Sequence, residues 1–191
     1  MKGKVDRLRA ELAQAGRGQE LVRVHRGKRL ESREGYVLDA GSQWLLLANL
    51  DPAIRVDGYC MLRVGDVRGV ERLASGAFVR DALSIRGQWP PAPLVPPVAL
   101  EDTRALLASL RPFWPLVTVH PELEDSDICF IGEIDRLGAR SVRLRCITPR
   151  AEWSDEGEKL MLKDVTRVDV GGAYEEALWQ VAAMRTGSRA E

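Results

Sequence analysis

The sequence predicts a mainly β protein with flanking helices, in which two tandem five-stranded small barrels follow each other along the chain. A helix precedes each barrel, and a further helix ends the chain. Three observations lead to this prediction. One sequence pattern occurs twice, its segments alternate apolar and polar residues, and a proline-rich stretch separates the two copies. Such self-similarity indicates two copies of one structural unit.

The two copies are recognised by pairs of matching segments. Near the start of each copy, LVRVH at residues 21–25 matches LVTVH at residues 116–120, an offset of 95 positions. Near the end, VGDVRGVE at residues 64–71 matches LKDVTRVD at residues 162–169, an offset of 98. Between them, Gly35 and Gly41 match Gly132 and Gly138. Short loop insertions account for the small difference between the two offsets.

Period-two patterns predict the strands. The clearest lies at residues 140–146, RSVRLRC, where apolar residues occupy every second position and so share one face. The stretches DAGS at 39–42 and RLGA at 136–139 are typical of hairpin turns. Five short antiparallel strands with one solvated face close most easily into a small barrel, because closure removes exposed edges.

Helices are predicted where apolar residues recur at three- and four-residue spacing. These stretches run from Val5 to Ala15, from Leu100 to Leu110 and from Ala173 to Ala182. The segment QWPPAPLVPP at 88–97 holds five prolines in ten residues, which predicts a stiff, extended linker. The expected domains are therefore residues 1–87 and 99–191, joined by a linker at 88–98.

Composition narrows the class of protein. The net charge is zero, but residues 1–95 hold 16 Lys and Arg against 11 Asp and Glu, whereas residues 96–191 hold 12 against 17. The three cysteines form no CxxC pair, which favours reduced, buried thiols. No apolar run is long enough for a membrane helix or a signal peptide. We therefore expect a cytoplasmic protein with no membrane association.

The segments GYVLD at 35–39, WLLLANL at 44–50 and DVRGV at 66–70 resemble the Sm-like or SH3-like small barrel, as do their counterparts GEID at 132–135, SVRL at 141–144 and DVTRV at 164–168. The resemblance covers about two thirds of the chain. Sm-like proteins commonly form rings and bind single-stranded RNA, so it implies RNA binding near Asn49 and Arg68-Gly69. Residues 164–178 also resemble the end of small uncharacterised bacterial proteins.

Candidate binding residues lie in two places. Arg23, Arg26, Lys28 and Arg29, with Arg33 nearby, form a basic stretch of the kind that follows a phosphate backbone, although Glu31 and Glu34 dilute it and a polar hairpin is the competing interpretation. Trp153 lies within an acidic run formed by Glu152, Asp155, Glu156 and Glu158. If this run binds anything, a basic partner surface fits better than a metal ion.

Other polar residues favour structural roles. His25 and His120 hold matched positions, but neither has metal ligands or catalytic partners at a suitable spacing in the sequence. Asp66 and Asp164 are also matched, and each is expected to fix a turn. The acidic run from Glu122 to Asp127 lacks the spacing of a calcium loop. Trp89, Phe113 and Trp114 are expected to join the two barrels or to form a binding patch.

No enzyme motif is present, so the sequence favours a non-enzymatic interaction module with no cofactor or metal. Its partner is expected to be a protein, including a second copy of the chain. Two alternatives stay open: an Sm-like RNA-binding protein, and an enzyme with a site in the cleft between the barrels around His25 or His120. An inhibitor or immunity-type partner of a basic toxin is a further alternative.

Overall fold

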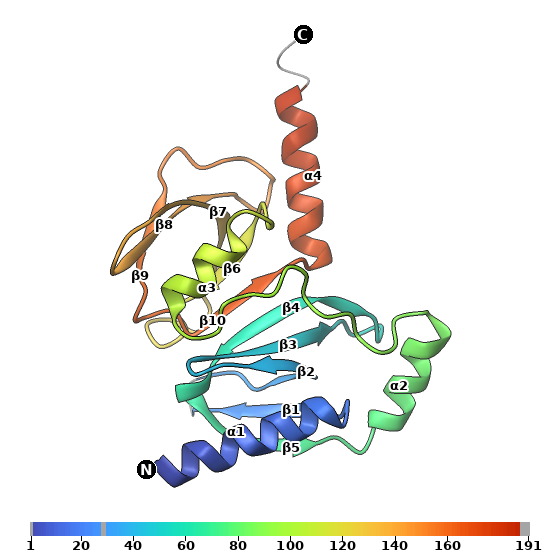
Figure 1. Ribbon diagram of the computed structural model, residues 1–191. Helices are drawn as coiled ribbons and strands as arrows, with labels where there is room; N and C mark the ends of the chain where they lie inside the picture. The colour runs from blue at the N-terminus through green and yellow to red at the C-terminus, as the bar shows by residue number, and fades with distance from the viewer. Residues whose placement is uncertain (1, 28–29, 188–191) are drawn as a thin grey trace.

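A computed structural model describes residues 2–27 and 30–187. It confirms the prediction of a mainly β fold with helices (Figure 1). The helices are α1 (Lys2–Arg17), α2 (Gly76–Ile85), α3 (Thr103–Leu110) and α4 (Ala173–Gly187), with a 3₁₀ turn at Val64–Asp66. The first five strands are β1 (Leu21–Arg26), β2 (Arg33–Ala40), β3 (Trp44–Leu50), β4 (Val56–Arg63) and β5 (Val67–Arg72). The second five are β6 (Val117–His120), β7 (Phe130–Leu137), β8 (Ser141–Cys146), β9 (Glu158–Met161) and β10 (Arg167–Val170).

All ten strands belong to one antiparallel sheet, with the order β5-β1-β2-β3-β4-β10-β6-β7-β8-β9. The expected arrangement of two separate barrels is not confirmed, because the sheet is open and continuous. The same order, fifth-first-second-third-fourth, occurs in each half. The halves meet where β4 of the first pairs with β10 of the second.

Pairing registers also agree between the halves. Val22 lies opposite Gly35 in the first half, and Val117 lies opposite Gly132 in the second. The second strand of each half carries an irregularity at the same place, between Val37 and Asp39 and between Ile134 and Arg136. Matched residues of the sequence therefore occupy matched positions in the sheet.

Gly35 and Gly132 give a test of this equivalence. A Cβ atom at Gly35 would collide with the backbone oxygen of Ala48, and one at Gly132 with the backbone oxygen of Arg145. Each Gly→Ala variant is expected to lose about 1–3 kcal/mol of unfolding free energy by overpacking, measured by urea denaturation. Gly69→Ala is the control, because no atom lies within 4 Å of its Cβ position. Equal stability of all three variants would contradict the prediction.

One face of the β4–β10 joint is apolar, whereas Arg167 and Asp169 of β10 lie on the other face. Val168 lies opposite Met61 and Val170 opposite Tyr59. In matched positions of the outer strands, β9 has Glu158 and Lys159 and β5 has Arg72. One core cluster spans the joint, combining Trp44, Leu46 and Met61 of the first half with residues of the second such as Leu106, Leu107 and Val168. The two halves therefore share a core.

The helices pack through the apolar residues on one of their faces. On α1, Leu12 and Ala15 are buried against the first half. The helix α3 begins after Asp102, whose side chain accepts a hydrogen bond from the Ala105 amide at 2.8 Å. The helix α4 projects away from the sheet (Figure 1) and packs through Leu178 and Ala182. The helix α2 was not predicted from the sequence.

The segment between the halves contains no helix or strand from residue 86 to residue 102, all of which the structure describes. It is anchored at both ends. Trp89 packs edge-on against Tyr36 with ring centroids 5.1 Å apart, and the Leu100 carbonyl accepts a hydrogen bond from the Trp44 amide at 3.0 Å. Trp114 packs against Tyr59 across the joint at 6.2 Å. Phe113 is 57% exposed.

Among the described residues, no helix is both long and apolar enough to cross a membrane.

Candidate functional site

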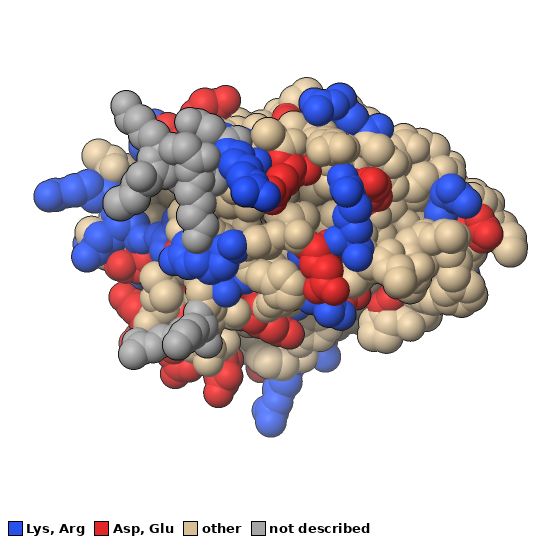
Figure 2. All heavy atoms as spheres, turned by 90° about the horizontal axis from the view of Figure 1, so that it is seen from below, with Lys and Arg blue, Asp and Glu red and all other residues tan. Residues whose placement is uncertain are grey.

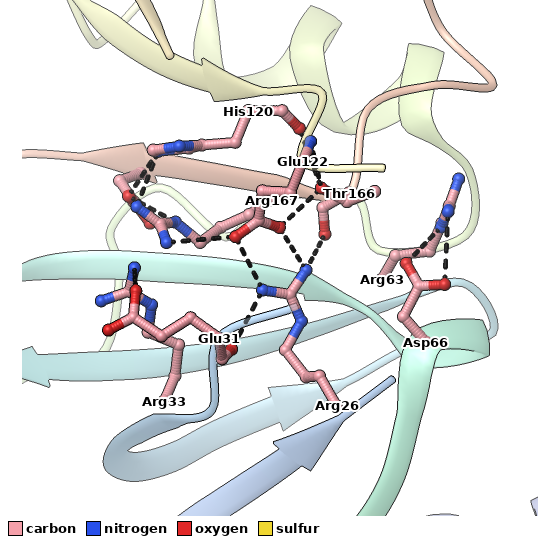
Figure 3. A network of polar contacts seen from close by, with 10 residues as sticks. Arg26, Glu31, Arg33, Arg63, Asp66, His120, Glu122, Thr166 and Arg167 are labelled. Carbon is pink, nitrogen blue, oxygen red and sulfur yellow. Dashed lines mark hydrogen bonds and ion pairs between the residues drawn. The ribbon is translucent and has the colours of Figure 1, made fainter. Parts of the chain in front are cut away.

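A buried polar network lies where the two halves meet (Figure 3). Arg26, at the end of β1, donates two hydrogen bonds to the carboxylate of Glu122, at 3.0 and 2.6 Å. A third bond runs from Arg26 to the Thr166 carbonyl at 3.1 Å. The Arg26 side chain is fully buried and that of Glu122 is 4% exposed. This bidentate pair links residues 96 positions apart.

The network continues along β10. Thr166 donates a hydrogen bond to Glu122 at 2.6 Å, and Arg167 lies 3.4 Å from the other carboxylate oxygen. Arg167 also donates to Asp169 at 2.9 Å. His120 Nε2 lies 2.9 Å from Asp169 Oδ2 and 2.9 Å from Arg167 Nη2. The bonds from Arg26 to Glu122 and Thr166 link the two halves, whereas the other contacts lie within the second half and orient Glu122 and Arg167. Buried charges are tolerated only when they are paired and hydrogen-bonded.

The three described arginines of the basic stretch are paired with carboxylates. Arg26 is buried against Glu122, whereas Arg23 pairs with Glu34 at 2.5 Å and Arg33 with Glu31 at 2.6 Å. Lys28 and Arg29 lie outside the described residues. Figure 2 shows basic and acidic side chains interspersed on the face seen from below. The described arginines of this stretch therefore serve ion pairs, and Arg26 is a structural residue.

The two histidines form matched contacts with carboxylates. His25 Nε2 lies 3.0 Å from Glu71 on the outer strand pair, and His120 makes the equivalent contact with Asp169 at the joint. Cys60 lies opposite Asp169 and is 1% exposed. Burial, with a further contribution from Asp169, raises the pKa of the Cys60 thiol well above its usual range. The thiol therefore stays protonated and is a poor nucleophile.

The acidic residues between Glu122 and Asp127 have two different environments. Glu122 belongs to the buried network, while Glu124, Asp125 and Asp127 line an open hollow of about 730 Å³ beside Glu31. No group of three or more His, Cys, Asp or Glu side chains in the described chain is placed to hold a metal ion. Asp66, the matched turn residue, pairs with Arg63 at 2.7 Å.

Trp153 lies on the second half, next to β8 and α4. The guanidinium of Arg145 lies 4.3 Å from the centre of its ring, a cation–π distance. Its ring also meets that of Trp179 edge-on at 6.3 Å. A pocket of about 330 Å³ is lined by Trp153, Arg145 and Asp155, among others. Trp153 thus belongs to an aromatic surface that extends beyond its acidic neighbours in the sequence to Arg145 and Trp179.

A second pocket, of about 310 Å³, lies between α4 and the start of β6. Its lining residues are Trp114, Pro115, Leu116, Gly171, Glu175, Glu176 and Trp179. Thr118 on β6 donates a hydrogen bond to Glu175 at 2.5 Å. We name Trp114, Trp153, Trp179, Asp155, Glu175 and Glu176 the tryptophan face. Trp179 was not predicted as a site residue, although its spacing from Glu175 and Glu176 places all three on one side of a helix.

Cys129 reports on the charge beside this pocket. Partial desolvation raises the pKa of its thiol, and the negative charges of Asp169 and Glu175 raise it further. In a Cys146→Ser background, Glu175→Gln is expected to lower the Cys129 pKa and to speed its alkylation at mildly alkaline pH, because more thiolate is present. The pH dependence of iodoacetamide labelling measures this. An unchanged titration midpoint would place Glu175 too far away to act.

No protein-family model, curated protein or solved structure matches the chain, so the functional conclusion depends on the geometry described above.

Proposed function

We propose that this chain is a non-enzymatic protein-binding module that docks a basic segment of a partner protein on its tryptophan face. The observation that carries the proposal is the pair of neighbouring pockets, which share the contact between Trp153 and Trp179. Tryptophans that are half-buried in pockets are typical anchors of protein interfaces.

Charge favours a basic partner. Glu175 and Glu176 line one pocket, whereas the other has two carboxylates, Asp135 and Asp155, beside two arginines, Arg143 and Arg145. The sequence from residue 96 to the end holds 12 Lys and Arg against 17 Asp and Glu, a balance of −5. Such a surface speeds encounter with a cationic segment and disfavours nucleic acid, whose phosphates it repels.

A second copy of the chain is a weaker candidate partner. Open sheet edges can pair between copies, but charged side chains on an edge strand oppose such pairing. The outer strands carry Arg68, Glu71 and Arg72 on β5 and Glu158 and Lys159 on β9. The edges of β4 and β10 already pair with each other within the chain. We therefore assign binding to the tryptophan face.

We also propose that each half is a unit of the Sm-like or SH3-like small-barrel type. The repeated strand order supports this, as does the matched irregularity in the second strand of each half. A bulge of this kind increases strand bending, which a small barrel needs.

A fluorescent peptide of arginine, serine and glycine tests the proposed function by anisotropy at low salt. The double variant Asp155→Lys/Glu176→Lys is expected to weaken binding about tenfold or more, equal to about 1.4 kcal/mol. Both side chains are exposed, so folding is expected to survive. The matched control, Glu31→Lys/Asp81→Lys, makes the same charge change at exposed sites of the first half.

The proposal fails if the wild-type chain does not bind the basic peptide, or if both double variants weaken binding equally. Tight binding of a single-stranded RNA oligonucleotide in place of the peptide would favour the RNA-binding alternative.

A further inference from the structure

The pocket between α4 and Trp114 has the chemistry of a site for one cationic side chain. Trp114 precedes β6, whereas Glu175, Glu176 and Trp179 lie within the first two turns of α4. Its volume of about 310 Å³ falls at the lower end of ligand pockets, which suits a single long side chain better than a cofactor.

The two carboxylates of this pocket lack a compensating cation. Within the described residues, neither Glu175 nor Glu176 forms an ion pair. Each instead accepts a hydrogen bond from a neutral group: Glu175 from Thr118 at 2.5 Å, and Glu176 from Gln180 at 2.9 Å. Glu175 is half-buried, so solvent screens its charge less than that of an exposed carboxylate. The pocket therefore offers fixed negative charge beside aromatic rings.

In the adjacent pocket, an indole of the tryptophan face already holds a guanidinium of the chain itself. There the Arg145 guanidinium lies 4.3 Å from the Trp153 ring centre, and Trp153 touches Trp179. A guanidinium is planar, stacks on indole and forms paired hydrogen bonds with a carboxylate, whereas an ammonium acts as a compact point charge. Two indoles and two carboxylates together fit the guanidinium better.

We propose that the Trp114–Trp179 pocket binds an arginine side chain of the basic partner segment. The guanidinium lies against the indole rings and pairs with Glu175, which Thr118 holds in position from β6. This inference rests on the proposed function and adds to it the residue type that is recognised. Thr118 is a positioning residue, because it acts through Glu175.

The two glutamates also stabilise α4, and the test must separate this effect from arginine binding. Negative charge in the first turn of a helix is favourable, so Glu175 and Glu176 contribute to α4 without any ligand. Removing either one is therefore expected to lower stability slightly, whether or not arginine binds. Ligand binding and stability must be measured on the same variants.

The experiment titrates N-acetyl-arginine amide into the ¹⁵N-labelled full chain and follows the five tryptophan indole N–H signals by NMR. The Trp114 and Trp179 signals are expected to shift and saturate, while those of Trp44 and Trp89 stay in place. The neutral analogue N-acetyl-citrulline amide, which keeps the shape and lacks the charge, is expected to give no saturable shift. Equal shifts with both compounds would overturn the proposal.

Variants locate the bound side chain. Glu175→Gln and Trp179→Leu are each expected to weaken arginine binding about fivefold or more, equal to about 1 kcal/mol. Thr118→Val is expected to weaken it less, since it frees the carboxylate without removing it. Asp81→Asn and Phe113→Leu are the controls, because both side chains are exposed and neither lines the pocket. If Trp179→Leu disturbs α4, Glu175→Gln alone decides.

The outcomes separate this inference from the proposed function. Peptide binding that depends on Asp155 and Glu176 but survives Glu175→Gln and Trp179→Leu supports the module and overturns the arginine pocket. Saturable arginine binding at Trp114 and Trp179 without any peptide binding supports the pocket and overturns the module. Absence of both overturns both.

Discussion

A Glu122→Ala variant is expected to lose about 3–5 kcal/mol of unfolding free energy. The substitution leaves the Arg26 guanidinium buried without its counter-charge, because the Arg26 side chain is fully buried and Glu122 is its bidentate partner. Thr166 and Arg167 also lose a contact with the carboxylate. Urea denaturation followed by circular dichroism measures the change.

Two comparisons isolate the buried charge as the cause. The double variant Arg26→Met/Glu122→Leu is expected to recover much of the loss, because apolar replacement of both partners removes the unpaired charge. Glu34→Ala, which removes the exposed partner of Arg23, is expected to cost less than about 1 kcal/mol. Equal costs for Glu122→Ala and Glu34→Ala would show that the network does not hold the two halves together.

Repetition in the sequence was the most informative feature for the fold. Because matched segments form matched strands, the sequence alone is enough to align Gly35 with Gly132 and the two VxVH stretches with each other. The strand-forming segments follow from alternation and turn residues, which act over short distances. Local patterns of this kind specify secondary structure well.

The joint between the halves depends on which edges pair, and local patterns do not specify that. A signal was nevertheless present. In β4, Tyr59, Cys60 and Met61 are followed by Leu62, whereas the matched stretch of β9 contains Glu158 and Lys159. An apolar edge in one copy and a charged edge in the other indicate that only the first is covered. The prediction of two barrels assumes that each set of five strands covers its own edges, whereas the edge of β4 is covered by β10.

The functional residues were harder to predict because they come together from distant segments. The sequence places Arg26 in a basic stretch and gives no sign of its partner, because Glu122 lies 96 positions away. The acidic neighbours of Trp153 make it a candidate in the sequence, but its contacts with Arg145 on β8 and Trp179 on α4 depend on the tertiary structure. The helix α2 was not predicted because its apolar residues do not lie on one face: Phe78 and Ile85 are 64% and 88% exposed.

Trp44→Ala is the second substitution with a large expected effect, a loss of about 3–5 kcal/mol. Trp44 is fully buried in the core shared by both halves. Its indole N–H has no hydrogen-bond partner among the described residues, so Trp44→Phe removes no hydrogen bond and is expected to cost less than about 1.5 kcal/mol. Urea denaturation of both variants, monitored by circular dichroism, checks the order.

The matched position in the second half explains why this substitution reports on the joint. Trp44 lies opposite Arg63 as Ser141 lies opposite Met161, yet Ser141 is only partly buried at the open end of the sheet. Ser141→Ala is therefore expected to change stability by less than about 0.5 kcal/mol. Residues of the second half cover Trp44, so the Trp44→Ala substitution is expected to weaken both halves. The Trp44→Ala and Trp44→Phe variants are each expected to unfold in one transition. Two separate transitions in the wild-type chain would mean that the shared core does not couple the halves.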